Sequence, residues 1–133
     1  MKKRNIQRWE YRFLEFQKSL KNLKKAVAIK SPDDIYRAGI LHLFEVSFEL
    51  SWKTLKDYLE FLGYIINSPK QVLIHAFKDG IISDGHSWYD ALEKRNLIAH
   101  TYNEEEVIEI ETLIRSKFLN LLKELEKYLK KCK

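Results

Sequence analysis

Apolar residues recur along this chain at alternating steps of three and four, the spacing of one face of an α-helix. The first such stripe lies within about Arg4 to Ile29, and lysines occupy the opposite face. Its members are Trp9, Phe13, Phe16, Leu20, Leu23 and Val27. Ser31-Pro32-Asp33 ends this segment and opens the next, because proline is tolerated in the first turn of a helix. The pattern predicts a first long helix.

The second stripe, from about Asp33 to Leu62, spreads apolar side chains over more than one face. One row holds Leu41, Phe44, Phe48, Trp52, Leu55, Leu59 and Leu62, and further apolar residues are Ile40, Leu43, Val46 and Leu50. A helix that is apolar on several faces is buried on several faces. We therefore expect this helix to be central in a bundle, and it could also line a homodimer interface. Gly63 is a typical C-terminal stop.

Two shorter helices follow. Ser68 with Pro69 behind it reads as an N-cap with proline at the first helical position, and this helix extends to about Asp79. Residues 80–85 form a loop in which Asp84 can cap a fourth helix from about His86 to Ala99.

A tight corner at residues 100–103 leads into the last long helix. Its cap could be Thr101 with Glu104 or Asn103 with Glu106, and three successive glutamates suit a helix N-terminus. The stripe that follows is Val107, Ile110, Ile114, Phe118, Leu121, Leu125 and Tyr128. Three long and two short helices, with no strand required, predict an all-α antiparallel four-helix-type bundle.

Composition agrees with this architecture. The 133 residues fit one domain, 1–133, and only 4 glycines and 2 prolines leave few turns. A net charge of +5 leans weakly towards anionic partners, because 19 acidic residues are interspersed with the 24 basic ones. Cys132 is the only cysteine, and no apolar run approaches the roughly 18 residues of a membrane span. We expect a cytoplasmic protein that does not enter the membrane.

One residue of the fourth helix does not fit a plain bundle. Arg95 stands where the apolar stripe should continue between Leu92 and Ala99. A permanently charged guanidinium on a core face is costly unless it is paired or opens into a cleft. It could pair with Glu45 or Glu49 of the second helix, or it could belong to a functional site.

His100 follows five residues later, about 140° around an ideal helix from Arg95. The two side chains would not share one helix face. They could still converge if the helix ends near Ala99 and the chain turns, or a second subunit could supply the missing half of a site. Asn96 lies one turn before His100 and could hold its ring.

The string Arg-Asn-Leu-Ile-Ala-His-Thr-Tyr at residues 95–102 resembles the R-x4-H-x-Y signature of HepT-type HEPN proteins, also described as nucleotidyltransferase substrate-binding proteins. The second helix at residues 44–59 and the stretch at residues 68–88 are similar to the same family, so the resemblance covers nearly the whole chain in order. His75 departs from the arginine or lysine expected at its position.

The resemblance implies a homodimer that works with a neighbouring minimal nucleotidyltransferase in a two-component toxin–antitoxin module. It implies that Arg95 and His100 form a metal-independent endoribonuclease site where two protomers meet, with Asn96 in support and RNA as substrate. Tyr102 would receive AMP from the transferase, which silences the toxin. Neither a metal nor a cofactor is expected, since no Asp, Glu and His set has convincing metal spacing.

Two further interpretations stay open on the sequence alone. The chain could be a non-catalytic subunit that presents a nucleotide or substrate to the transferase, or a plain helical dimer or adaptor in which the motif only joins helices. His42 is expected to be a core histidine, His86 to lie at a helix N-terminus, and Trp52 and Trp88 to be core. The sequence does not say which of Glu45, Glu49 and Asp57 orients Arg95 or Lys53.

Overall fold

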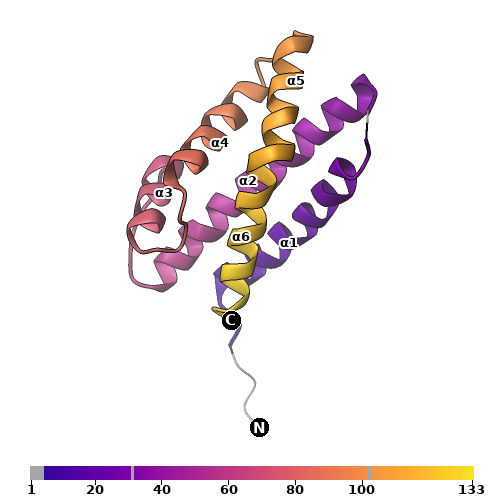
Figure 1. The fold of residues 1–133 in the computed structure, drawn as a ribbon. Helices are drawn as coiled ribbons and strands as arrows, with labels where there is room; N and C mark the ends of the chain where they lie inside the picture. Colours follow the sequence, from indigo (N-terminus) through magenta and orange to yellow (C-terminus); the bar gives the residue numbers. More distant parts are fainter. Residues whose placement is uncertain (1–4, 31, 102) are drawn as a thin grey trace.

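The computed structural model describes residues 5–30, 32–101 and 103–133, and within these ranges every regular element is helical. Figure 1 shows long helices running side by side with a short helix at one end of the bundle. The helices are α1 (Arg8–Val27), α2 (Asp34–Phe61), α3 (Pro69–Lys78), α4 (Gly85–Ile98), α5 (Glu104–Leu113) and α6 (Leu119–Lys130). Because α5 and α6 are joined by a π-helical turn, they form one rod, and the described chain contains the three long and two short helices that the sequence predicted.

The helix α2 is central, as its apolar faces predicted. It packs against α1, α3, α4, α5 and α6, and its neighbours surround it in Figure 1. Its buried apolar residues are Ile40, Leu41, Phe44, Phe48, Trp52, Leu55, Tyr58 and Leu59. Because every other helix packs against α2, this helix also fixes the position of α4 and of Arg95.

Small polar residues let α1 and α2 approach closely. Ser19 and Ser47 are both buried, and their hydroxyl oxygens lie 2.6 Å apart in a hydrogen bond between the two helices. Ser51 and Thr54 are buried on the same helix and donate to the α2 carbonyls of Phe48 and Leu50. Buried hydroxyls are tolerated here because each has a partner.

The predicted cap of α4 forms, because Asp84 accepts from Ser87 N at 3.0 Å. The helix α2 is capped by Asp33, which accepts from Tyr36 N at 2.9 Å, so Pro32 precedes the helix and does not lie in its first turn as predicted. At the corner before α5, the second of the two predicted caps forms: Asn103 accepts from Glu106 N at 2.8 Å. Gly63 adopts a φ of 104°, the left-handed conformation that suits glycine after a helix end. The predicted start of the first helix near Arg4 lies outside the described residues.

The last rod differs from the predicted single α-helix by its π-helical turn, Ile114–Phe118. The stripe takes two successive steps of four, from Ile110 through Ile114 to Phe118, which would carry the apolar face about 80° around a regular α-helix. A wider turn removes this drift, and both Ile114 and Phe118 are fully buried. Within the turn, Arg115 donates to Val27 O and Ile29 O, so the π turn also anchors the end of α1.

We expect Phe118→Ala to destabilise the fold strongly. Phe118 is fully buried and its ring stacks on that of Phe44, with centroids 5.4 Å apart. Truncating a buried phenylalanine leaves a cavity and should lower the free energy of unfolding by about 3–5 kcal/mol in urea denaturation. The matched control is Phe61→Ala, where a half-exposed ring should cost less than about 1 kcal/mol. Equal losses in the two variants would contradict this account of the core.

Candidate functional site

Arg95 is held against the central helix by an acidic partner. Its Nη2 donates to Glu49 Oε2 of α2, and its Nη1 donates to the neighbouring Asn96 Oδ1 at 3.1 Å. The Arg95 side chain keeps 30% of its surface exposed, and its buried Nε has no hydrogen-bond partner among the described residues. Glu49 thus fixes the position of the guanidinium, and the side chain remains partly exposed with an N–H group that makes no hydrogen bond to a described residue.

Glu49 is the hub of this small network. Its carboxylate also accepts from the indole Nε1 of Trp52 at 3.0 Å and lies 3.3 Å from Lys53 Nζ. Burial acts to raise the pKa of Glu49, but the Trp52 hydrogen bond and the positive charges of Arg95 and Lys53 outweigh it and hold the pKa below its ordinary value. Glu49 therefore stays ionised at neutral pH and neutralises much of the charge of Arg95. Of the acids that the sequence offered, this one orients both Arg95 and Lys53.

His100 lies in the turn just after α4 ends. Its backbone N donates to Leu97 O at 2.9 Å, and Thr101 Oγ1 donates to the same carbonyl at 2.8 Å. The exposed imidazole lines a cavity of about 230 Å³ between the end of α4 and the start of α5. The cavity is completed by Lys94, Leu97, Thr101, Glu106, Glu109 and Ile110.

Within one chain the described contacts do not join Arg95 to His100. Arg95 is directed towards α2, while His100 borders the α4–α5 cavity, in which Arg95 takes no part. The hydrogen bond recorded for Asn96 goes to Arg95, so it positions the arginine and leaves the predicted hold on the imidazole without support. Tyr102 lies outside the described residues. Within one chain the two motif residues thus have different partners at the end of α4.

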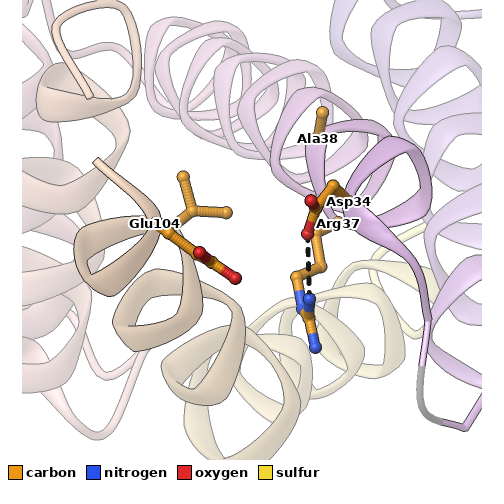
Figure 2. A pocket seen from close by; sticks show the side chains of 5 residues that line it. Asp34, Arg37, Ala38 and Glu104 are labelled. Carbon is orange, nitrogen blue, oxygen red and sulfur yellow. Dashed lines mark hydrogen bonds and ion pairs between the residues drawn. The ribbon is translucent and has the colours of Figure 1, made fainter. Parts of the chain in front are cut away.

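A second arginine near the corner was missed by the sequence reasoning. Arg37 of α2 lines a cavity of about 220 Å³ with Asp34, Ala38, Glu104 and Val107. Figure 2 shows Arg37 paired with Asp34, and Glu104 of α5 lies across the cavity. Arg37 Nε also donates to Glu111 Oε1 at 2.9 Å. The available signal was its position four residues before Leu41, in register with the apolar stripe, which is the same anomaly as Arg95.

Other candidate residues fall into supporting places. Asp57 is buried and pairs with Arg12 Nε at 3.0 Å, so it ties α2 to α1 and takes no part at Arg95. The prediction that His42 is a core histidine is wrong: its side chain is 71% exposed and faces Glu45, with Nδ1 3.8 Å from the carboxylate. His42 projects from the solvent side of α2, about 100° from the neighbouring core position Leu41.

The predictions for Trp52, Trp88 and His86 are confirmed. Trp52 and Trp88 belong to the core, and His86 is the second residue of α4. His75 packs its ring against Tyr64, with Nε2 3.4 Å from Asp79 Oδ2. No group of three or more His, Cys, Asp or Glu side chains in the described part of the chain is arranged to hold a metal ion.

The fold and the motif define a class: an all-helical bundle that presents an arginine and a histidine, five residues apart, at the end of its fourth helix. The family model described as nucleotidyltransferase substrate binding protein like matches residues 11–131, and the chain belongs to that family. Over 98 residues it is 32% identical to a Haemophilus influenzae protein named Probable ribonuclease HepT. That alignment covers 65% of this chain and 66% of the relative, slightly less than two thirds of each.

Solved structures share the fold. A crystal structure of a Thermus thermophilus protein superimposes with a TM-score of 0.77 at 29% identity, covering 83% of this chain and 94% of that one. A Haemophilus influenzae structure, described as the fold of a substrate binding domain of a nucleotidyltransferase, gives a TM-score of 0.67 at 23% identity and covers 92% and 96%. The resemblance drawn from the sequence is thereby confirmed, and the all-α architecture with it. No helix in the described ranges is long and apolar enough to cross a bilayer.

We expect Glu49→Gln to weaken the fold in a pH-dependent way. At neutral pH the variant loses a charged partner of half-buried Arg95, which should cost about 1–2 kcal/mol of unfolding free energy. Because the folded state lowers the pKa of Glu49, its stabilisation is present above the ordinary value of 4.5 and is lost as the pH falls through the folded pKa. The gap between wild type and variant should therefore shrink below pH 4.5.

Denaturation curves at several pH values measure that gap, and Glu45→Gln is the matched control on the same helix. Glu45 faces His42 at 3.8 Å, and its neutralisation should change stability little. A Glu49→Gln variant as stable as wild type at neutral pH would mean that Arg95 does not depend on this pair.

Proposed function

We propose that this protein is the toxin subunit of a two-component toxin–antitoxin module, a metal-independent endoribonuclease whose antitoxin is a minimal nucleotidyltransferase. It acts in the cytoplasm as a homodimer, and Arg95 of one protomer works with His100 of the other. The observation that carries this proposal is the state of Arg95: it is preset by Glu49 and still partly exposed, and the exposed His100 follows five residues later, just after the end of α4.

The dimer follows from the separation of the two residues. Glu106 and Glu109 share the cavity of His100, and their negative charges disfavour an RNA phosphate that relies on this protomer's cavity alone. A second protomer would bring its own Arg95 to that histidine and supply the missing positive charge. Leu97 stands between the two motif residues in the chain and is half exposed, as an apolar residue at a subunit contact would be in the isolated chain.

The chemistry needs only these two side chains. His100 takes the proton from a ribose 2′-hydroxyl as its oxygen attacks the adjacent phosphorus, and the bond from phosphorus to the 5′ oxygen of the next nucleotide breaks. The leaving 5′ oxygen takes a proton from water, and the protonated His100 returns its proton to the hydroxide that remains. Arg95 donates to the phosphorane oxygens, where negative charge accumulates. The products are a cyclic phosphate and a free 5′-hydroxyl. Asn96 supports the reaction by holding Arg95 through its Oδ1.

Tyr102 is the proposed point of control, two residues after His100. AMP added to its hydroxyl by the transferase brings a negative phosphodiester and a bulky nucleoside to the site. Both would keep an RNA phosphate from Arg95 and His100 by repulsion and by occupying the space.

An alternative is a non-catalytic subunit that binds a nucleotide or other substrate and presents it to the transferase. The Glu49–Arg95 pair favours it, because an arginine largely neutralised by Glu49 stabilises the charge of a phosphorane transition state less strongly than a free one, while its exposed part can still hold a phosphate. The family's own description as substrate-binding is compatible with either function.

Cleavage of a labelled tRNA pool in EDTA decides between the two. Wild type should cleave, and His100→Ala and Arg95→Ala should each lower the rate by about 10²–10⁴-fold, because each removes a group that acts in the transition state. His42→Ala is the matched control, an exposed histidine on α2 that should leave the rate unchanged. Absence of cleavage by wild type at any protein concentration would favour the binding subunit.

Mixing the two inactive variants tests the shared site. If Arg95 of one protomer serves His100 of the other, heterodimers of Arg95→Ala and His100→Ala contain one intact pair, and part of the activity should return. A site contained in one chain would give no recovery.

Tyr102→Phe should separate cleavage from control. Its purified form should cleave RNA like wild type, since the hydroxyl takes no part in the reaction, but it should not accept AMP from the partner transferase with ATP. Intact mass measures the modification, and growth of cells producing both proteins measures rescue. The exposed Tyr11→Phe on α1 is the control and should be modified and silenced normally. Modification of Tyr102→Phe to the wild-type extent would exclude Tyr102 as the target.

A further inference from the structure

A third cavity lies between α3 and the first turns of α4, which run side by side at one end of the bundle (Figure 1). Its volume is about 440 Å³, roughly twice that of the cavities beside His100 and Arg37 and within the range of small-molecule sites. It shares no residue with either of them. Its lining consists of Lys70, Leu73, Ile74, Phe77, Lys78, Gly85, His86 and Tyr89.

Two aromatic rings form part of this lining and remain open to solvent. Phe77 is 51% exposed and Tyr89 is 41% exposed, and neither stacks on another aromatic ring in the described part of the chain. A Cβ placed on Gly85 would lie 3.1 Å from the Phe77 ring, so this glycine allows the ring to rest against the start of α4. Two exposed aromatic rings in one recess form an apolar surface that is typical of a binding site, and they could stack on a flat aromatic ligand.

The charges on the rim are basic. Lys70 and Lys78 make no ion pair with a described residue, and Lys70 Nζ lies 5.6 Å from the centre of the Tyr89 ring. The nearby acids are engaged elsewhere: Asp79 faces His75, and Asp84 caps α4 through Ser87. The cavity therefore offers two uncompensated cations and no carboxylate in its lining.

We propose that this cavity binds a free nucleoside phosphate, with the base on Tyr89 and Phe77 and the phosphates on Lys70 and Lys78. Stacking accepts any base, because each has a π face, and the two ammonium groups match a phosphate chain. A volume of about 440 Å³ is large enough for a mononucleotide. Lys70 exchanges its contact with the Tyr89 ring for the phosphate on binding. This site does not depend on the proposed ribonuclease function.

Calorimetric titration of the full-length protein tests the proposal, with ATP, adenosine and inorganic tripolyphosphate as probes. ATP should bind. Adenosine lacks the phosphates and tripolyphosphate lacks the base, so the affinity of each should be at least about ten-fold lower than that of ATP. Tyr89→Ala and Lys78→Gln should each weaken ATP binding by about ten-fold. Tyr89→Phe keeps the ring and should keep the affinity, which separates stacking from a general loss of folding.

Matched controls come from α1. Tyr11→Ala removes a tyrosine that is 58% exposed, and Lys18→Gln removes a lysine on the same helix, remote from the cavity, and neither should change ATP binding. Arg95→Ala should also bind ATP with wild-type affinity, because the cavity lies at the other end of α4.

Several results would overturn the proposal. They are no heat of ATP binding at millimolar concentration, tripolyphosphate binding as tightly as ATP, or loss of binding in Arg95→Ala with Tyr89→Ala unaffected. Binding of a short single-stranded RNA at Tyr89 without binding of ATP would assign the cavity to RNA and would equally exclude a free mononucleotide.

Discussion

The ion pair between Glu49 and Arg95 joins the central helix to the helix that carries the motif. α2 can be apolar on several faces only because five other helical segments surround it, and α4 is one of them. Arg95 of α4 points its guanidinium towards α2 and pairs there with Glu49. Trp52 and Lys53 hold the carboxylate of Glu49 in place. The position of Arg95 is therefore set by the bundle itself, and a partly buried charge becomes compatible with the core.

A second ionic network fixes the opposite side of the same end of the bundle. Glu111 binds both Arg37 of α2 and Arg115 of the π turn, and Arg115 reaches the last carbonyls of α1. The π turn keeps the buried stripe of the last rod facing the core and aims Arg115 at α1 in the same few residues. These hydrogen bonds tie α5 and the π turn to α2 and to the end of α1.

The two ends of α4 differ in their chemistry. The C-terminal end carries the motif, with a neutralised arginine and a histidine beside glutamates, while the N-terminal end borders an aromatic recess with two lysines that pair with no described acid. The positive charge of the chain is therefore largely neutralised at the C-terminal end of α4 and less so at its N-terminal end.

The sequence by itself determined the order of the helices, the caps at Ser68 and Asp84 and the anomaly at Arg95, because periodicity and capping are local properties. It also identified the family through the string at residues 95–102. Only the tertiary structure showed that Glu49 and not Glu45 pairs with Arg95, and that Arg37 lines a cavity near the start of α5. It also showed that His42 is exposed and that the last helix contains a π turn beginning at Ile114. These outcomes depend on which faces meet across the bundle, and no spacing within one helix specifies its neighbour. For the same reason the α3–α4 recess became visible only when two short helices were placed side by side.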